Sequence, residues 1–170
     1  RMTVYETLAE PLIFHRVTNE KNIKIRVTSL MDEVGLPKTS MHKYPHEFSG
    51  GQRQRIAVGR AIGIKPEFII ADEPVSALDV TIQSQILDLI VGLVESYSIT
   101  MLFISHDLSV VRSVTDRVAV MKSGKILEKE KTELLWRKPK NQYTQNLLRS
   151  IPIPDPRKER ARLLSRNEQD

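Results

Sequence analysis

Two acidic residues, Asp72 and Glu73, directly follow a short apolar run, Phe68 to Ala71. A run of this length between a proline and two acids is typical of a buried parallel strand, and ligands bind where the carboxyl ends of such strands meet. Two carboxylates there could divide the work, with Asp72 directed to Mg²⁺ and Glu73 to an attacking water. The alternative is a strand-end turn before Pro74, with both side chains in solvent.

A second group, Ser49-Gly50-Gly51-Gln52, stands where a helix is expected to begin. Backbone N–H groups at a helix start carry partial positive charge and bind phosphate, and glycines let an anion approach closely. Ser49 adds a hydroxyl group and is a suitable N-cap. The alternative is a capped helix that begins with glycine and binds nothing.

The third candidate is His106, which follows the second apolar run, Thr100 to Ser105. We expect it at the same sheet edge as Glu73, where an imidazole can donate a hydrogen bond to phosphate at neutral pH. A structural role is the alternative for a single histidine. The other three histidines, His15, His42 and His46, have no comparable placement.

The elements that must position these residues fall into two kinds. The first 65 residues predict helices only, beginning with a capping box of Thr3 and Glu6, and we expect Pro11 to kink or end the first helix. Strands and helices then alternate, which indicates an α/β layer with a parallel sheet. The expected elements are helices from Thr3, from Glu20 to Gly35 and from Gly51 to Ile64, strands at Phe68–Ala71 and Thr100–Ser105, helices from Val80 and Leu108, a hairpin around Ser123-Gly124, and helices from Thr132 and at Gln142–Ser150. The charged end after Ile151 is expected to be a surface or mobile extension.

Composition restricts the classes of protein. The chain has 170 residues, 40% hydrophobic and 28% charged, which predicts a globular protein with one real core. There are no cysteines, so disulfides and thiolate metal sites are excluded, and the composition fits a cytosolic location. No run approaches the roughly 18 apolar residues of a membrane span. The net charge of +5 is modest and, with both signs mixed, is typical of a solvated surface; a nucleic-acid or anionic-membrane partner is the alternative.

Taken together and in order, these segments resemble the motifs of ATP-binding cassette (ABC) ATPases. FSGGQRQR, from Phe48 to Arg55, is similar to their signature motif, with Phe48 in place of the commoner leucine. FIIADEP resembles the Walker B strand with its catalytic glutamate, SALD (Ser76 to Asp79) the D-loop, and FISHD the segment with the switch histidine. The resemblance covers roughly residues 48 to 107, and the flanking elements also fit.

The resemblance implies a role for each matched position. Asp72 would help to hold Mg²⁺, Glu73 would orient and deprotonate the attacking water, and His106 would contact the γ-phosphate. Asp79 would lie across a dimer interface. The signature residues would contact ATP bound to the opposite subunit: Ser49, Gly50, Gly51 and Gln52. The implied reaction is in-line phosphoryl transfer from ATP to water.

One part of the family pattern is missing. None of the seven glycines begins G-x-x-x-x-G-K-[ST], the P-loop that cradles the β- and γ-phosphates. The chain therefore resembles the C-terminal part of a cassette, without Walker A and Q-loop, and we expect it to be inactive alone and to expose sheet edges. The implied fold is α/β, a partial P-loop NTPase core with parallel strands. Its expected parts are a helical subdomain (1–65), the second half of the ATPase core (66–131) and a C-terminal helical extension (132–170).

The sequence around the motifs resembles ATP-binding subunits of oligopeptide and dipeptide importers, mainly through the tail KPKNQYTQNLLRSIPIPDP. Nickel and glutathione importers use similar subunits and remain alternatives for the cargo. The implied partners are a second ATPase subunit, two membrane permeases at the cytoplasmic face and, indirectly, a substrate-binding protein. An ABC ATPase acting on nucleic acid or ribosomes is a competing class, but the coiled-coil insertion or second cassette that would support it is absent from the chain. A non-catalytic interaction module is the other alternative, which the intact Glu73 and His106 disfavour for the parent protein.

Overall fold

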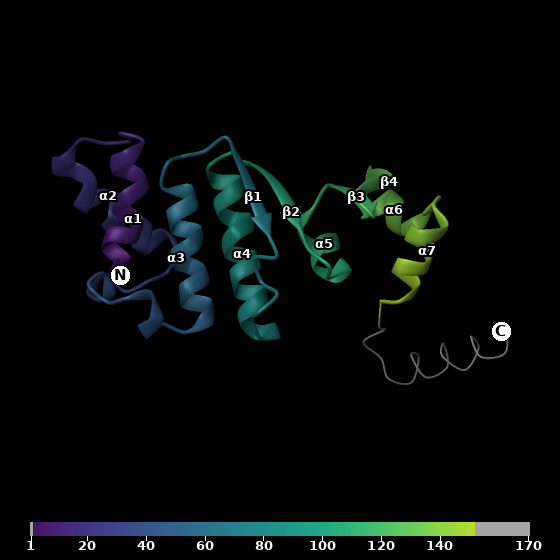
Figure 1. Cartoon of the computed structure of the whole chain (residues 1–170), viewed down its shortest axis with the longest axis horizontal. Helices are drawn as coiled ribbons and strands as arrows, with labels where there is room; N and C mark the ends of the chain where they lie inside the picture. The colour runs from purple at the N-terminus through teal and green to yellow at the C-terminus, as the bar shows by residue number, and fades with distance from the viewer. Residues whose placement is uncertain (1, 152–170) are drawn as a thin grey trace. The chain divides into compact units, whose positions relative to one another are not determined.

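The computed structural model describes residues 2–151 and divides the chain into two compact units, residues 1–106 and 107–170. Figure 1 labels their elements, and each unit is considered by itself. Within the described residues, no helix is long and apolar enough to cross a membrane. The expected division after residues 65 and 131 stays a prediction.

The first unit opens with three helices, as predicted. They are α1 (Val4–Phe14), α2 (Glu20–Glu33) and α3 (Gly50–Ile62), with the 3₁₀ turns η1 (Lys38–Ser40) and η2 (Pro45–Glu47) in the connector. The capping box of Thr3 and Glu6 is present, and the Asn19 side chain caps α2. Gly35, at a φ of 68°, follows α2 in the left-handed conformation that ends helices.

Pro11 does not end α1, contrary to one of the two outcomes expected from the sequence. The helix continues to Phe14, and the N–H group of His15 donates to the carbonyl of Pro11 at 3.0 Å. Leu12, directly after the proline, is fully buried in the core. The packing of this last turn therefore outweighs the one backbone hydrogen bond that proline cannot donate.

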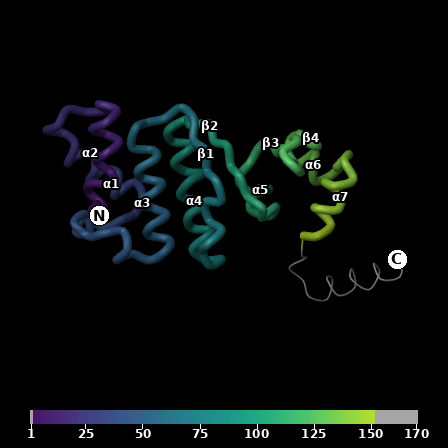
Figure 2. Tube along the Cα trace, viewed as in Figure 1, coloured from purple at the N-terminus to yellow at the C-terminus, as the bar shows by residue number. Residues whose placement is uncertain are grey.

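A strand, a helix and a second strand complete the first unit. These are β1 (Phe68–Asp72), α4 (Val80–Ser96) and β2 (Thr100–Ile104). The strands pair in parallel, with Phe68 opposite Thr100 and Asp72 opposite Ile104, which confirms the predicted parallel sheet. The trace in Figure 2 follows the chain from β1 through α4 to β2. Both strands therefore deliver their carboxyl ends to one edge.

The two strands are not buried on both faces, so that prediction was wrong. Ile69 packs against the core cluster, but alternate residues point away from it and are 43–61% exposed: Phe68, Ile70, Leu102 and Ile104. Within the described residues, β1 pairs with β2 alone. The apolar run correctly predicted strands, but nothing in the described part of the chain covers their second face.

The core of the first unit joins the helices to the strand region. Leu8, Leu12, Leu30 and Met31 are fully buried and fill the space between the first helices. The same cluster includes Leu93 of α4 and Ile99, the residue before β2. Because one continuous core includes these residues, the position of α4 depends on α1, α2 and α3.

The second unit holds a hairpin between helices. Its elements are α5 (Leu108–Val114), β3 (Arg117–Lys122), β4 (Lys125–Lys131), α6 (Thr132–Arg137) and α7 (Gln142–Arg149). The antiparallel strands turn at Ser123-Gly124, with φ values of 49° and 75°, as a type I′ turn requires. The predicted hairpin is confirmed, whereas the expected extension after Ile151 lies outside the described residues.

Candidate functional site

The carboxyl ends of β1 and β2 bring Glu73 and His106 into direct contact. Glu73 follows the last residue of β1, and His106 lies two residues beyond β2. Atom Nδ1 of His106 is 2.8 Å from Oε1 of Glu73, across 33 residues of sequence. Two of the residues predicted to share a sheet edge therefore meet there as a hydrogen-bonded pair.

The backbone of Glu73 is held in an uncommon conformation. Its φ is 48°, in the left-handed region that bulky residues seldom adopt. Its N–H group donates to the carbonyl of Ile104 at 2.9 Å, which extends the pairing of the strands by one residue. Its own carbonyl accepts a hydrogen bond from the Ser76 hydroxyl at 3.2 Å. These contacts hold the residue in a conformation that costs energy and directs its side chain to His106.

The two carboxylate oxygens of Glu73 differ. Oε1 contacts His106, whereas Oε2 is buried and has no hydrogen-bond partner among the described residues. A buried carboxylate oxygen without a partner is costly, so this atom is suited to one further donor, such as a water molecule. Glu73 therefore has one oxygen held by the imidazole and one available to accept a further hydrogen bond.

Asp72 is exposed at the same strand end, beside a hollow of about 210 Å³ that is lined by residues of α3, β1 and α4. Within the described part of the chain, no group of three or more His, Asp or Glu side chains is placed to hold a metal ion. Asp72 could contribute one oxygen ligand, and Mg²⁺ commonly takes only one or two carboxylates, with water and phosphate as its other ligands.

The start of α3 forms a reciprocal capping box. The N–H group of Gln52 donates to Oγ of Ser49 at 3.4 Å, and the N–H group of Ser49 donates to Oε1 of Gln52 at 3.1 Å. The N–H groups of Gly50 and Gly51 donate to no acceptor within the described residues. Two of the first amide groups are thus capped and two are available to an anion.

The two glycines also lie against the segment that leads into α4. Gly51 is buried, and a Cβ atom on it would lie 2.4 Å from Cγ2 of Ile82. A Cβ atom on Gly50 would lie 3.2 Å from Cδ2 of Leu78. Local sequence patterns do not indicate this contact, because about 30 residues separate the partners.

Asp79 caps α4. Its Oδ1 atom accepts a hydrogen bond from the N–H group of Ile82 at 3.0 Å, and its side chain is exposed. Residues 49–52 and Asp79 are therefore connected through the packing of Leu78 and Ile82, while Asp72, Glu73 and His106 lie at the strand ends. The eight residues singled out from the sequence thus form two groups.

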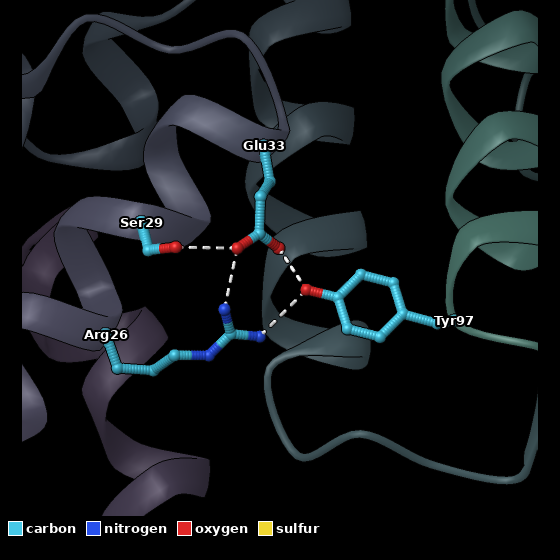
Figure 3. A network of polar contacts seen from close by, with 4 residues as sticks. All are labelled: Arg26, Ser29, Glu33 and Tyr97. Atoms are coloured by element: carbon cyan, nitrogen blue, oxygen red, sulfur yellow. Dashed lines mark hydrogen bonds and ion pairs between the residues drawn. The ribbon is translucent and has the colours of Figure 1, made fainter.

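A polar cluster that the sequence did not indicate links α2 to the end of α4 (Figure 3). The hydroxyl of Tyr97 donates to Oε2 of Glu33 at 2.6 Å, and Arg26 lies 2.6 Å from Oε1 of the same carboxylate. Ser29 also donates to Oε1, at 2.8 Å. Partial burial acts to raise the pKa of Glu33, but the hydrogen bonds from Tyr97 and Ser29 and the charge of Arg26 outweigh it and hold that pKa below its usual value.

The chain is similar to known transport ATP-binding proteins over most of its length. Residues 1–76 match the family model described as ABC transporter. The oligopeptide transport ATP-binding protein OppF of Bacillus subtilis is 49% identical over 96% of this chain and 54% of its own length. AmiF of Streptococcus pneumoniae, another oligopeptide transport ATP-binding protein, is 48% identical over 96% of this chain and 54% of its own length.

A solved structure gives the same answer for the fold. CbiO1 from Clostridium perfringens, part of the ABC transporter complex cbiONQ, superposes with a TM-score of 0.70 at 26% identity. The match covers 80% of this chain and 53% of that one. The chain spans about half the length of the curated relatives it matches. Its first 76 residues match the ABC transporter family model, and 96% of the chain is similar to oligopeptide transport ATP-binding proteins.

Proposed function

We propose that this chain is part of an ATP-hydrolysing subunit of an ABC importer for oligopeptides or dipeptides. The observation that carries the proposal is the contact of Glu73 with His106 at the carboxyl ends of two parallel strands. An acid and an imidazole that meet at such an edge are suited to a reaction with water at a phosphate.

In this proposal Glu73 is the general base. His106 holds Oε1, so the unpartnered Oε2 accepts the proton of the attacking water. The backbone contacts of Glu73 fix the position of its carboxylate before substrate binds. A carboxylate held in position accelerates a reaction more than a flexible one of the same strength. In this proposal His106 positions Glu73 through Nδ1, and its ring, once protonated on Nε2 as well, would contact a terminal phosphate.

The proposed cofactors are ATP and Mg²⁺. When bound, the cation neutralises charge that develops on the transferred phosphoryl group. Asp72 would provide a protein oxygen for it, directly or through water, because its carboxylate is exposed at the same strand end. The remaining ligands would be water and phosphate oxygens.

The proposed partner is a second ATPase subunit. The free N–H groups of Gly50 and Gly51, together with Ser49 and Gln52, would contact ATP that is bound to the second subunit. Asp79 would lie at the interface between the two subunits. We assign the cargo from the relatives OppF and AmiF, which are oligopeptide transport ATP-binding proteins. The pair of subunits would dock on membrane permeases at the cytoplasmic face.

Hydrolysis by a hybrid subunit tests the proposal. The hybrid would carry the N-terminal half of the B. subtilis OppF relative, which would supply a P-loop, joined to this chain. We expect Mg²⁺-dependent ATP hydrolysis that Glu73→Gln lowers by about 100-fold or more. Glu95→Gln, at an exposed glutamate of α4, is the matched control and should leave turnover unchanged.

Two results would contradict parts of the proposal. Unchanged turnover in Glu73→Gln would remove the base assignment. Saturable, Mg²⁺-dependent hydrolysis by the pure 170-residue chain would contradict the inference that it needs a phosphate cradle from elsewhere.

A further inference from the structure

Gly51 and Ile82 fill one space between α3 and α4, which lie side by side in Figure 1. A Cβ atom on Gly51 would lie 2.4 Å from Cγ2 of Ile82, closer than nonbonded carbon atoms approach in proteins. The Cβ atom of residue 82 itself would be 3.8 Å away, an ordinary contact. The conflict is therefore with one methyl group, the β-branch of Ile82.

The direction of this contact bears on why residue 51 is a glycine. A side chain at position 51 would point at α4, and one at position 50 would point at Leu78. In both cases the nearest atom belongs to a side chain of this protein. These glycines thus permit the start of α3 to lie close to Leu78 and Ile82 of the same chain.

We infer that Ile82 and Leu78 are positioning residues for the start of α3, and that Gly51 lacks a side chain because the Ile82 methyl group occupies its place. The same helix turn of α4 is capped by Asp79, through the N–H group of Ile82. The cap fixes the backbone of Ile82. The Ile82 side chain in turn determines how closely Gly51, and with it the capping box of Ser49 and Gln52, can approach α4.

This inference extends the proposed function without depending on it. If the N–H groups of Gly50 and Gly51 serve ATP, then Ile82 sets where they lie. The packing itself does not require a nucleotide, so it can be tested on the 170-residue chain without one. A failure of the test would leave the assignment of Glu73 untouched.

A double-mutant cycle at positions 51 and 82 tests the inference. Gly51→Ala should lower the Tm of the chain by about 5 °C, because overpacking costs more than the helix propensity of alanine returns. Ile82→Leu removes the β-branch at nearly constant volume, so Gly51→Ala combined with Ile82→Leu should recover most of that loss. Ile82→Val is the matched control, because valine keeps both Cγ methyl positions and should recover none.

Amide NMR shifts of residues 49–52 provide a readout that a general loss of stability would not move. Gly51→Ala should shift the amides of Ser49 and Gln52, whose capping box depends on the helix start, and Ile82→Leu should return them toward the wild-type values. If Gly51→Ala fails to fold, recovery of folding by Ile82→Leu but not by Ile82→Val supports the inference. Wild-type stability in Gly51→Ala, or equal recovery by leucine and valine, would overturn it.

Discussion

His106 Nδ1 lies 2.8 Å from Glu73 Oε1, and this contact joins the ends of β1 and β2 at the candidate site. A carboxylate only accepts hydrogen bonds, so the imidazole must donate from Nδ1. In the neutral ring the proton therefore stands on Nδ1, and Nε2 carries none. The contact fixes the tautomer as well as the orientation of the ring.

Glu73→Gln should invert that tautomer. An amide NH₂ group at position 73 can donate to Nδ1, so the neutral ring would hold its proton on Nε2. Nitrogen-15 NMR of the four histidines, at a pH where the rings are neutral, distinguishes the two forms. His15, His42 and His46 serve as internal controls and should not change. An unchanged His106 spectrum would mean that the contact with Glu73 does not persist in solution.

Asp79 should prove to be a cap whose charge is dispensable for folding. Asp79→Ala removes the acceptor for the Ile82 N–H group and should lower the free energy of unfolding by about 1 kcal/mol. Asp79→Ser keeps an acceptor and should stay close to the wild type in urea denaturation. Equal loss in both variants would show that the carboxylate, and not the cap, matters to stability. If Asp79→Ser keeps wild-type stability but abolishes hydrolysis in the hybrid subunit, the Asp79 carboxylate is needed at the interface between the subunits.

Acid should weaken the contact between Tyr97 and Glu33. The pKa of Glu33 is lowered in the folded state. The ionised Glu33 therefore adds to the free energy of unfolding above the unfolded pKa of about 4.3, and this stabilisation is lost as the pH falls through the lower folded pKa. Tyr97→Phe removes the hydroxyl that donates to Glu33 and should cost about 1–2 kcal/mol at pH 7. The difference between the two proteins should shrink below about pH 4.

Tyr5→Phe is the control for this measurement. Tyr5 is a partly buried tyrosine that packs on the same core, and its hydroxyl makes no hydrogen bond to another of the described residues. Urea denaturation between pH 3 and pH 7 should show a difference from the wild type that does not vary with pH. A Tyr97→Phe deficit that is constant over the same range would contradict the assigned contact.

The uncovered face of β1 and β2 should tolerate polar residues. Ile70 is 61% exposed, so Ile70→Thr should change the free energy of unfolding by less than about 1 kcal/mol. Ile86, fully buried in α4, is the comparison, and Ile86→Ala should cost about 2–5 kcal/mol. Ile70→Thr should also reduce self-association measured by light scattering, because an apolar face and open strand edges favour pairing with other chains. A large loss of stability in Ile70→Thr would mean that this face is covered in solution.

The local elements of the fold could be predicted because their signals are local. Thr3 and Glu6 form a capping box within four residues, and this indicates the start of α1. Ser123 and Gly124 indicate the hairpin turn because both adopt a positive φ. The parallel sheet followed from two apolar runs separated by a helical one. These features depend on residues that are close in sequence.

What could not be predicted depends on contacts between distant residues. The burial of β1 and β2 was overestimated, because an apolar run does not say which element covers it. The continuation of α1 through Pro11 reflects the burial of Leu12, a property of the packed core. The contact of Gly51 with Ile82 and that of Tyr97 with Glu33 leave no periodic signal, and the roles assigned to the site residues stay predictions.

The positive φ of Glu73 has a consequence for how this position can change over evolution. At a φ of 48°, glycine would be more stable by about 1 kcal/mol, since it carries no Cβ atom to crowd the backbone. Glu73→Gly would also remove a buried oxygen that has no partner among the described residues. Selection for folding alone would thus drive this position toward glycine. A glutamate here marks a position where another requirement opposes stability, and homologues that have lost that requirement should accumulate glycine or asparagine at this turn.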